Sequence, residues 1–214
     1  MNNNDIIKFK ISIIGDSGVG KTCIIKKFLE SDKFDLKKEI PDVTININPY
    51  IHYTTLDGQK LVIEFVDTMG SEKFRSLVLS SLRGSHGLLI VFDLTDEQSF
   101  DNIIYWVNQA KEVVDINYVN VTMIGNKCDL ERKVSKERIE NFKKKNKLNI
   151  KFSYFETSAL TGEGISECMF NVVDNINKLY EKYKNNNNFK QKNIHLNNEK
   201  NNEKNNENKS GCPC

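Results

Sequence analysis

Residues 15–22 read GDSGVGKT, and this stretch decides the fold of the chain. It fits the pattern G-x-x-x-x-G-K-[ST], follows a strand-like run at 9–14 and precedes a helix-like run at 21–29. Gly15, Gly18 and Gly20 permit φ values closed to other residues, so successive N–H groups can surround phosphate oxygens beside a helix N-terminus. Lys21 is then expected to contact the β- and γ-phosphates, and the Thr22 hydroxyl to supply one ligand to Mg²⁺. A glycine-rich turn before a chance lysine is the alternative, and the strand–loop–helix context argues against it.

Length and composition limit the classes of protein that the chain can represent. Its 214 residues are 38% hydrophobic, and the repeatedly apolar segments end near Tyr183, which indicates one α/β domain with a single core. A net charge of +2 provides no large basic field, so nucleic acid is not an expected partner. The five cysteines show no metal-ligand spacing and no secretory signal precedes them, so reduced cytosolic thiols are expected. No apolar run approaches the roughly 18 residues of a membrane span.

Strand-like and helix-like segments alternate, which indicates a mostly parallel sheet covered on both faces. Strands are expected at 9–14, 61–66, 87–94, 121–124 and 152–156, with 50–56 antiparallel to 61–66 across a turn at Asp57 and Gly58. Helices are expected at 21–30, 72–83, 99–114, 136–147 and 164–183. The predicted fold class is α/β: a P-loop NTPase domain with a six-stranded sheet flanked by about five helices. Ligands bind at the carboxyl ends of the strands in such sheets.

Polar residues follow three of these strands. Asp67 ends one strand, 45 residues beyond Thr22, where it could hold Mg²⁺ through water, and the Gly70 N–H could bond the γ-phosphate. Asn126, Lys127 and Asp129 follow the strand at 121–124, and 157–159 (TSA) follow the strand at 152–156. A carboxylate at Asp129 could accept hydrogen bonds from N1–H and the 2-amino group of guanine, which adenine cannot match.

The C-terminal segment differs in character. Twelve of the 24 residues at 185–208 are asparagine, and so polar a segment cannot offset its ordering entropy by burial. We therefore expect a disordered tail at 185–214, which ends in Cys212-Pro213-Cys214.

These elements, in this order, resemble a small GTPase of the Ras superfamily over residues 8–183. GDSGVGKTC at 15–23, KFRSL at 73–77, IVFDLTDEQSF at 90–100, Trp106 and GNKCDL at 125–130 are similar to the Rab family. The resemblance implies an N-terminal extension at 1–7, a GTP-binding domain at 8–184, GTP/GDP and Mg²⁺ as cofactors, and a role in vesicle trafficking. It also implies exchange factors, activating proteins, Rab effectors, an escort protein, a geranylgeranyl transferase and a GDP-dissociation inhibitor as partners.

The resemblance assigns site residues one by one. Nucleotide contacts are implied for Gly15, Asp16, Ser17, Gly18, Val19, Gly20, Lys21, Thr22, Cys23, Phe34, Thr44, Asp67, Gly70, Asn126, Lys127, Asp129, Leu130, Ser158, Ala159 and Leu160. Metal ligation is implied for Thr22, Thr44 and Asp67, and catalysis for Lys21, Thr44, Gly70 and Ser71. Counting back from the turn at Asp57 identifies Thr44 as the family's switch threonine. Counting forward from Thr22 does not, because the interval from Thr22 to Thr44 is four residues longer than in the family. An insertion in the first switch loop is therefore expected, and it also leaves the position of Phe34, the aromatic on the guanine edge, open.

Three departures from the family pattern concern mechanism and partners. Ser71 stands where the family has a glutamine that orients the attacking water, and Met69 replaces an alanine. A serine is too short for that role, so slow intrinsic hydrolysis is expected. Pro49, Val66 and Ser81 occupy three positions where aromatic residues line the usual effector surface, which indicates either an unusual effector set or simple drift.

Cys212 and Cys214 are similar to the double geranylgeranyl acceptor of Rab proteins. They do not form a C-a-a-X box, since Gly211 is fourth from the end. Two lipids give stable anchoring where one is marginal. The protein is thus expected on the cytoplasmic face of a membrane with a cytosolic pool; unmodified surface thiols are the alternative.

Three function classes follow: a slowly cycling Rab-like switch, a nearly constitutive GTP-bound binding module, and a P-loop kinase or ATPase. The last would need an acceptor-substrate domain, which no separate segment supplies.

Overall fold

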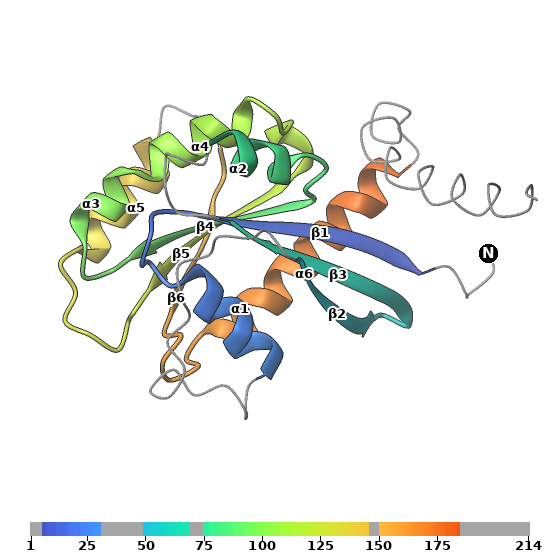
Figure 1. Ribbon diagram of the computed structural model, residues 1–214, viewed down its shortest axis with the longest axis horizontal. Helices are drawn as coiled ribbons and strands as arrows, with labels where there is room; N and C mark the ends of the chain where they lie inside the picture. The colour runs from blue at the N-terminus through green and yellow to red at the C-terminus, as the bar shows by residue number, and fades with distance from the viewer. Residues whose placement is uncertain (1–5, 31–48, 69–74, 146–149, 185–214) are drawn as a thin grey trace, which may run out of the picture.

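A computed structural model describes residues 6–30, 49–68, 75–145 and 150–184. These residues alternate between strands and helices as the sequence predicts (Figure 1). The strands are β1 (Ile7–Ile14), β2 (Pro49–Leu56), β3 (Gln59–Asp67), β4 (Gly87–Asp93), β5 (Asn120–Asn126) and β6 (Ser153–Thr157). The helices are α1 (Lys21–Glu30), α2 (Arg75–Leu82), α3 (Glu97–Asp101), α4 (Ile103–Lys111), the 3-10 helix η2 (Ile116–Tyr118), α5 (Lys136–Lys145) and α6 (Ile165–Tyr183).

The strands form one six-stranded sheet in the order β2-β3-β1-β4-β5-β6. Neighbouring strands run parallel except β2 and β3, which pair antiparallel with Leu56 opposite Gln59. Asp57 and Gly58 join these two strands with φ values of 49° and 78°, as a two-residue hairpin turn requires. The α/β fold with a six-stranded, mostly parallel sheet is therefore confirmed.

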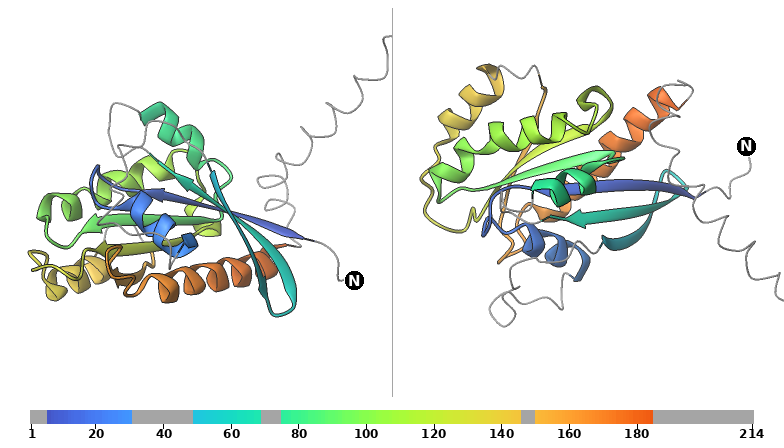
Figure 2. Two further views of the ribbon diagram at one scale, coloured as in Figure 1. Left: turned by 60° about the horizontal axis from the view of Figure 1, so that its bottom comes forward. Right: turned by 45° about the horizontal axis from the view of Figure 1, so that its top comes forward.

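Helices cover both faces of the sheet (Figure 2). Side chains of α1 and α6 pack in one apolar cluster, and those of α2, α3, α4 and α5 pack in a second. All seven residues of β4 are buried, because Leu89 and Val91 enter the first cluster while Leu88 and Ile90 enter the second. A strand buried on both faces must be apolar at successive positions, which explains its continuous hydrophobic run.

The prediction of a single helix at 99–114 is wrong. The structure contains α3 and α4, which meet at Asn102. The Asp96 carboxylate begins α3 two residues earlier than expected by accepting a hydrogen bond from the Gln98 N–H at 3.0 Å. The Asn102 N–H ends α3 by donating to the Gln98 and Phe100 carbonyls. The described residues therefore hold α3 and α4 in place of that one predicted helix.

Candidate functional site

The loop at 15–20 joins β1 to α1 and lies against the carboxyl ends of β4 and β5. A Cβ atom at Gly15, where φ is 145°, would lie 2.2 Å from the Val91 carbonyl oxygen. One at Gly20, where φ is 98°, would lie 2.3 Å from the Asn126 Nδ2. Both the backbone conformation and the close approach thus require glycine at these two positions. The resulting cradle suits a chain of phosphates, because its N–H groups precede the N-terminus of α1.

Lys21, the first residue of α1, is enclosed by this loop. Its ammonium Nζ donates to the carbonyl oxygens of Gly15 at 2.9 Å and Asp16 at 2.7 Å, and the residue is 6% exposed. Burial lowers the pKa of Lys21 to about 8, although the carboxylates of Asp67 and Asp16 act in the opposite direction. A bound phosphate would favour the protonated ammonium and offer it a charged acceptor, so the geometry fits the predicted role.

Thr22 and Asp67 bring two oxygen donors together from α1 and the end of β3. The Thr22 Oγ1 donates to the Asp67 Oδ2 at 2.5 Å, and Asp67 is 2% exposed. A hydroxyl and a carboxylate are hard oxygen ligands of the kind that Mg²⁺ prefers, and Mg²⁺ commonly keeps several waters beside one or two such groups. The donor set therefore fits a magnesium ion that completes its shell with water and phosphate.

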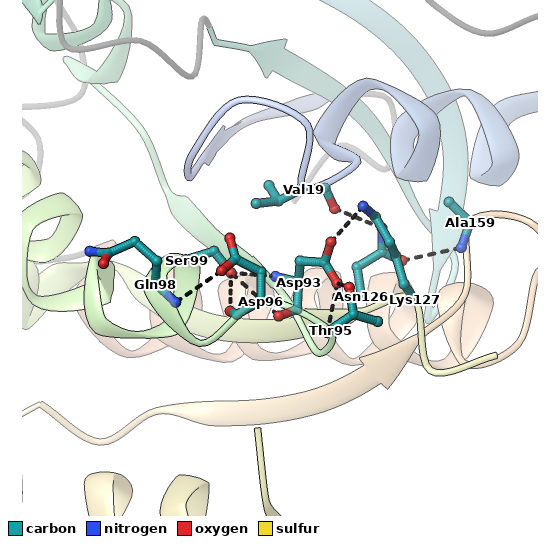
Figure 3. Close-up of polar contacts among 9 residues, drawn as sticks. All are labelled: Val19, Asp93, Thr95, Asp96, Gln98, Ser99, Asn126, Lys127 and Ala159. Carbon is teal, nitrogen blue, oxygen red and sulfur yellow. Dashed lines mark hydrogen bonds and ion pairs between the residues drawn. The ribbon is translucent and has the colours of Figure 1, made fainter. Parts of the chain in front are cut away.

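Asn126, the last residue of β5, links the phosphate loop to the loop after β6 (Figure 3). Its Nδ2 donates to the Val19 carbonyl at 2.8 Å, and its Oδ1 accepts from the Thr157 hydroxyl at 3.1 Å and the Ala159 N–H at 3.2 Å. Asn126 is 1% exposed, so each of these bonds is shielded from water. The phosphate loop and the loop after β6 are thereby fixed to the end of β5.

Asp93, the last residue of β4, is a polar site residue to which sequence reasoning gave no role. Its Oδ2 lies 2.5 Å from the Lys127 Nζ, and its Oδ1 accepts from the Thr95 N–H at 2.8 Å and hydroxyl at 2.7 Å (Figure 3). Burial alone would raise the pKa of Asp93, yet the hydrogen bonds from Lys127 and Thr95 lower it. Asp93 therefore stays ionised and holds Lys127, whose φ is 64°, at the strand end. Its position as the last residue of a buried strand was the available signal.

Three of the residues assigned to the nucleotide are exposed at the rim of the same edge. Asp129 is exposed just beyond β5, while Leu130 and Leu160 are 53% and 37% exposed. Ser158 is buried, and its hydroxyl oxygen accepts a hydrogen bond from the Thr161 N–H at 3.0 Å. An exposed carboxylate at the rim is open to a base that approaches from solvent.

The remaining assigned residues of the loop region differ in their surroundings. Ser17 and Gly18 are exposed, whereas Val19 is buried. The carboxylate of Asp16 accepts hydrogen bonds from two side chains of the α3–α4 region. Cys23 is half-buried against the first core cluster, and burial raises the pKa of its thiol. The Cys23 thiol is thus held in its neutral form.

Six assigned residues lie outside the described part of the chain: Phe34, Thr44, Gly70, Ser71, Cys212 and Cys214. Of the three positions considered for effectors, Pro49 is exposed, Val66 is buried and Ser81 is half-buried. Pro49 and Val66 are register partners across β2 and β3.

Comparisons with known proteins agree with this arrangement. A family model described as the Ras family matches residues 10–178. A Homo sapiens protein described as Ras-related protein Rab-8B is 38% identical over 182 residues, which cover 84% of each chain. Ras-related protein Rab-13 from Rattus norvegicus is 36% identical over 170 residues, or 78% of this chain and 79% of that protein. Ras-related protein Rab-8A from Mus musculus is 36% identical over 176 residues, 81% of each chain.

Proposed function

We propose that this chain, which belongs to the Rab family of small GTPases within the Ras family, holds GTP or GDP with Mg²⁺ at the carboxyl edge of its sheet. It acts there as a switch in vesicle trafficking. The observation that carries the proposal is the Asn126 side chain, which ties the phosphate loop to the loop after β6 through Val19 and Ala159. Lys21 would contact the phosphates, and Thr22 with Asp67 would hold the metal. We place the GTP-binding domain at 8–184, between an extension at 1–7 and a tail at 185–214.

Guanine is the base that the site supports. The side-chain oxygens of Asp129 would accept two hydrogen bonds from N1–H and the 2-amino group of guanine, and adenine has no matching pair of donors. A polar group in a site left without its partner costs about 1–3 kcal/mol, so two mismatched positions give strong discrimination. Lys127, held by Asp93 at 2.5 Å, would place its aliphatic stem beside the base plane.

We propose that hydrolysis of bound GTP is slow. Phosphoryl transfer depends on positioning and on charge stabilisation, because the protein does little covalent chemistry. Lys21 and Mg²⁺ would supply charge stabilisation, with the Gly70 N–H and the Thr44 hydroxyl on the γ-phosphate. Ser71 leaves the attacking water without the long side chain that family members use. A regulated switch would then depend on an activating protein for both an arginine and a water-positioning group.

The nucleotide that copurifies with the protein tests this function. Native protein is denatured in the presence of excess Mg²⁺ chelator, and the released nucleotide is separated and quantified. We expect about one guanine nucleotide per chain, since the binding groups are complete. Mostly GDP supports the slow switch, and mostly GTP supports the alternative of a nearly constitutive GTP-bound module. Stoichiometric adenine nucleotide, or tighter binding of ATP than of GTP, would contradict both and support a P-loop kinase or ATPase.

We propose membrane attachment through geranylgeranyl groups on Cys212 and Cys214. None of the helices in the described ranges is long and apolar enough to cross a membrane. Two thioether-linked lipids are sufficient for stable anchoring, whereas one gives marginal binding. The proposed location is the cytoplasmic face of a membrane, with a cytosolic pool that an escort protein and a GDP-dissociation inhibitor would keep soluble.

The same reasoning extends to effectors. Val66 is 4% exposed, so it offers little contact area, and Pro49 and Ser81 are not aromatic. Aromatic anchors commonly dominate interface energetics. We propose that this chain uses other contacts, or an unusual effector set, at that surface.

A further inference from the structure

We propose that Asp16, Asn102 and Trp106 form a positioning clamp that fixes the outer half of the phosphate loop and thereby slows nucleotide release. The inference rests on the proposed nucleotide-binding function. It assigns a role to the carboxylate of Asp16, which is separate from the backbone contacts that the loop motif predicts.

The three side chains meet in close hydrogen bonds between distant parts of the chain. The Asn102 Nδ2 donates to the Asp16 Oδ2 at 2.7 Å, and the Trp106 indole Nε1–H donates to the Asp16 Oδ1 at 2.6 Å. Each carboxylate oxygen thus receives one donor, and both bonds are in the short range typical of a charged acceptor. Trp106 is 4% exposed with its ring in the second core cluster, so one donor is rigidly held.

The break between α3 and α4 explains how both donors reach one carboxylate. Asn102 lies at the break, and the Trp106 N–H donates to the Asn102 carbonyl at 3.1 Å in the first turn of α4. Residues four apart lie on the same face of a helix. The two donors are therefore presented side by side from one helical turn.

Asp16 is also the residue that links the clamp to the phosphate-binding lysine. Its carbonyl oxygen accepts a hydrogen bond from the Lys21 Nζ at 2.7 Å. On the other side of the loop, the Val19 carbonyl is held by Asn126 at 2.8 Å. The exposed residues Ser17 and Gly18 are thus bracketed by two side-chain anchors, one from α4 and one from β5.

Electrostatics gives the clamp a second effect. A carboxylate inside a loop that holds phosphates repels them, because like charges at short range oppose each other. The two N–H donors stabilise this carboxylate and direct its oxygens toward α4. Without one of these donors, the Asp16 carboxylate can rotate toward the phosphates. Removing the charge itself would relieve that repulsion.

This combination predicts a specific pattern in nucleotide release. Trp106→Phe and Asn102→Ala are made in the native chain and in an Asp16→Asn chain, and release of a fluorescent GDP analogue is measured with Mg²⁺ and excess GDP. We expect Trp106→Phe or Asn102→Ala to speed release about 10-fold in the native chain. In the Asp16→Asn chain the same changes should alter release by less than about 3-fold, since the charge that they compensate is gone.

Arg138→Gln provides a matched control. Arg138 holds α3 through ion pairs to Glu97 and Asp101, both at 2.7 Å, and neither partner is in the clamp. This variant should leave the release rate unchanged. Urea unfolding of each nucleotide-free variant separates loss of the clamp from general loss of stability.

Two results would overturn the clamp. Equal acceleration by Trp106→Phe in both backgrounds would show that only helix packing matters, and an unchanged release rate would show that the contact does not reach the loop. If wild-type protein does not bind the analogue, the proposed function fails while the contact is still testable. Trp106 is the sole tryptophan, so Asp16→Asn should then shift its emission in the nucleotide-free protein, and no shift would refute the contact.

Discussion

Replacing Asn126 with alanine is expected to accelerate nucleotide release about 100-fold. The variant removes the bonds to Val19, Thr157 and Ala159 and leaves their buried groups unsatisfied. Each such loss costs about 1–3 kcal/mol, and about 2.8 kcal/mol corresponds to a factor of 100. The phosphate loop and the loop after β6 would then no longer be held together. Release of a fluorescent GDP analogue measures the effect directly.

A second asparagine on the same strand provides the control. Asn120 lies at the opposite end of β5, where its side-chain oxygen accepts from the Thr122 hydroxyl at 3.0 Å. Asn120→Ala should therefore leave the release rate unchanged. Thr157→Val, which removes one of the three bonds at nearly constant volume, should have a smaller effect than Asn126→Ala and covers the case in which that variant does not fold. Native release rates in both Asn126→Ala and Thr157→Val would refute the role of Asn126.

Replacing Cys212 and Cys214 together with serine is expected to move the protein from the membrane fraction of its cells to the soluble fraction. Each single replacement should give a partial shift, because one lipid chain provides only marginal binding. Fractionation of cells that express each variant, with mass measurement of the purified C-terminal peptide, reports both attachment and modification. Ser210→Ala, in the same segment, is the matched control and should behave as the native protein. A double variant that still sediments with membranes would contradict lipid anchoring through this pair.

Much of the architecture could be predicted because it depends on short-range signals. The continuous apolar run of β4 and the turn at Asp57 and Gly58 identify strands and a hairpin without tertiary information. The motif at 15–20 predicts the phosphate cradle, because no residue other than glycine fits at Gly15 and Gly20. The convergence of Asp67 and Asn126 on that cradle follows from a general property of parallel sheets, whose carboxyl ends share one edge.

Other features depended on contacts between distant segments. Helix α3 ends at Asn102, and this end divides the predicted helix at 99–114 into two. The spacing of apolar residues continues through Asn102 and therefore does not predict the break. The start of α3 could have been predicted from Asp96, because an aspartate is a favourable N-cap residue. The bond from Trp106 to Asp16 joins residues 90 positions apart and follows no motif. Such contacts emerge only when the sheet has brought β1 beside β4.

We propose that binding of the nucleotide and its hydrolysis depend on different residues of this chain. The described residues supply a glycine cradle, a buried lysine, a hydroxyl–carboxylate pair and a polar residue that links the loops. These groups support binding. We propose that hydrolysis depends in addition on Ser71, which lies outside the described residues.

Single-turnover hydrolysis of bound GTP, measured for the wild type and for Ser71→Gln, tests this separation most directly. Both proteins are loaded with GTP in the absence of Mg²⁺, hydrolysis is started with Mg²⁺, and the GDP formed is quantified over time. We expect equal loading of the two proteins and hydrolysis at least about 10-fold faster in Ser71→Gln, because a glutamine can orient the attacking water. Equal hydrolysis rates in the two proteins would contradict this proposal.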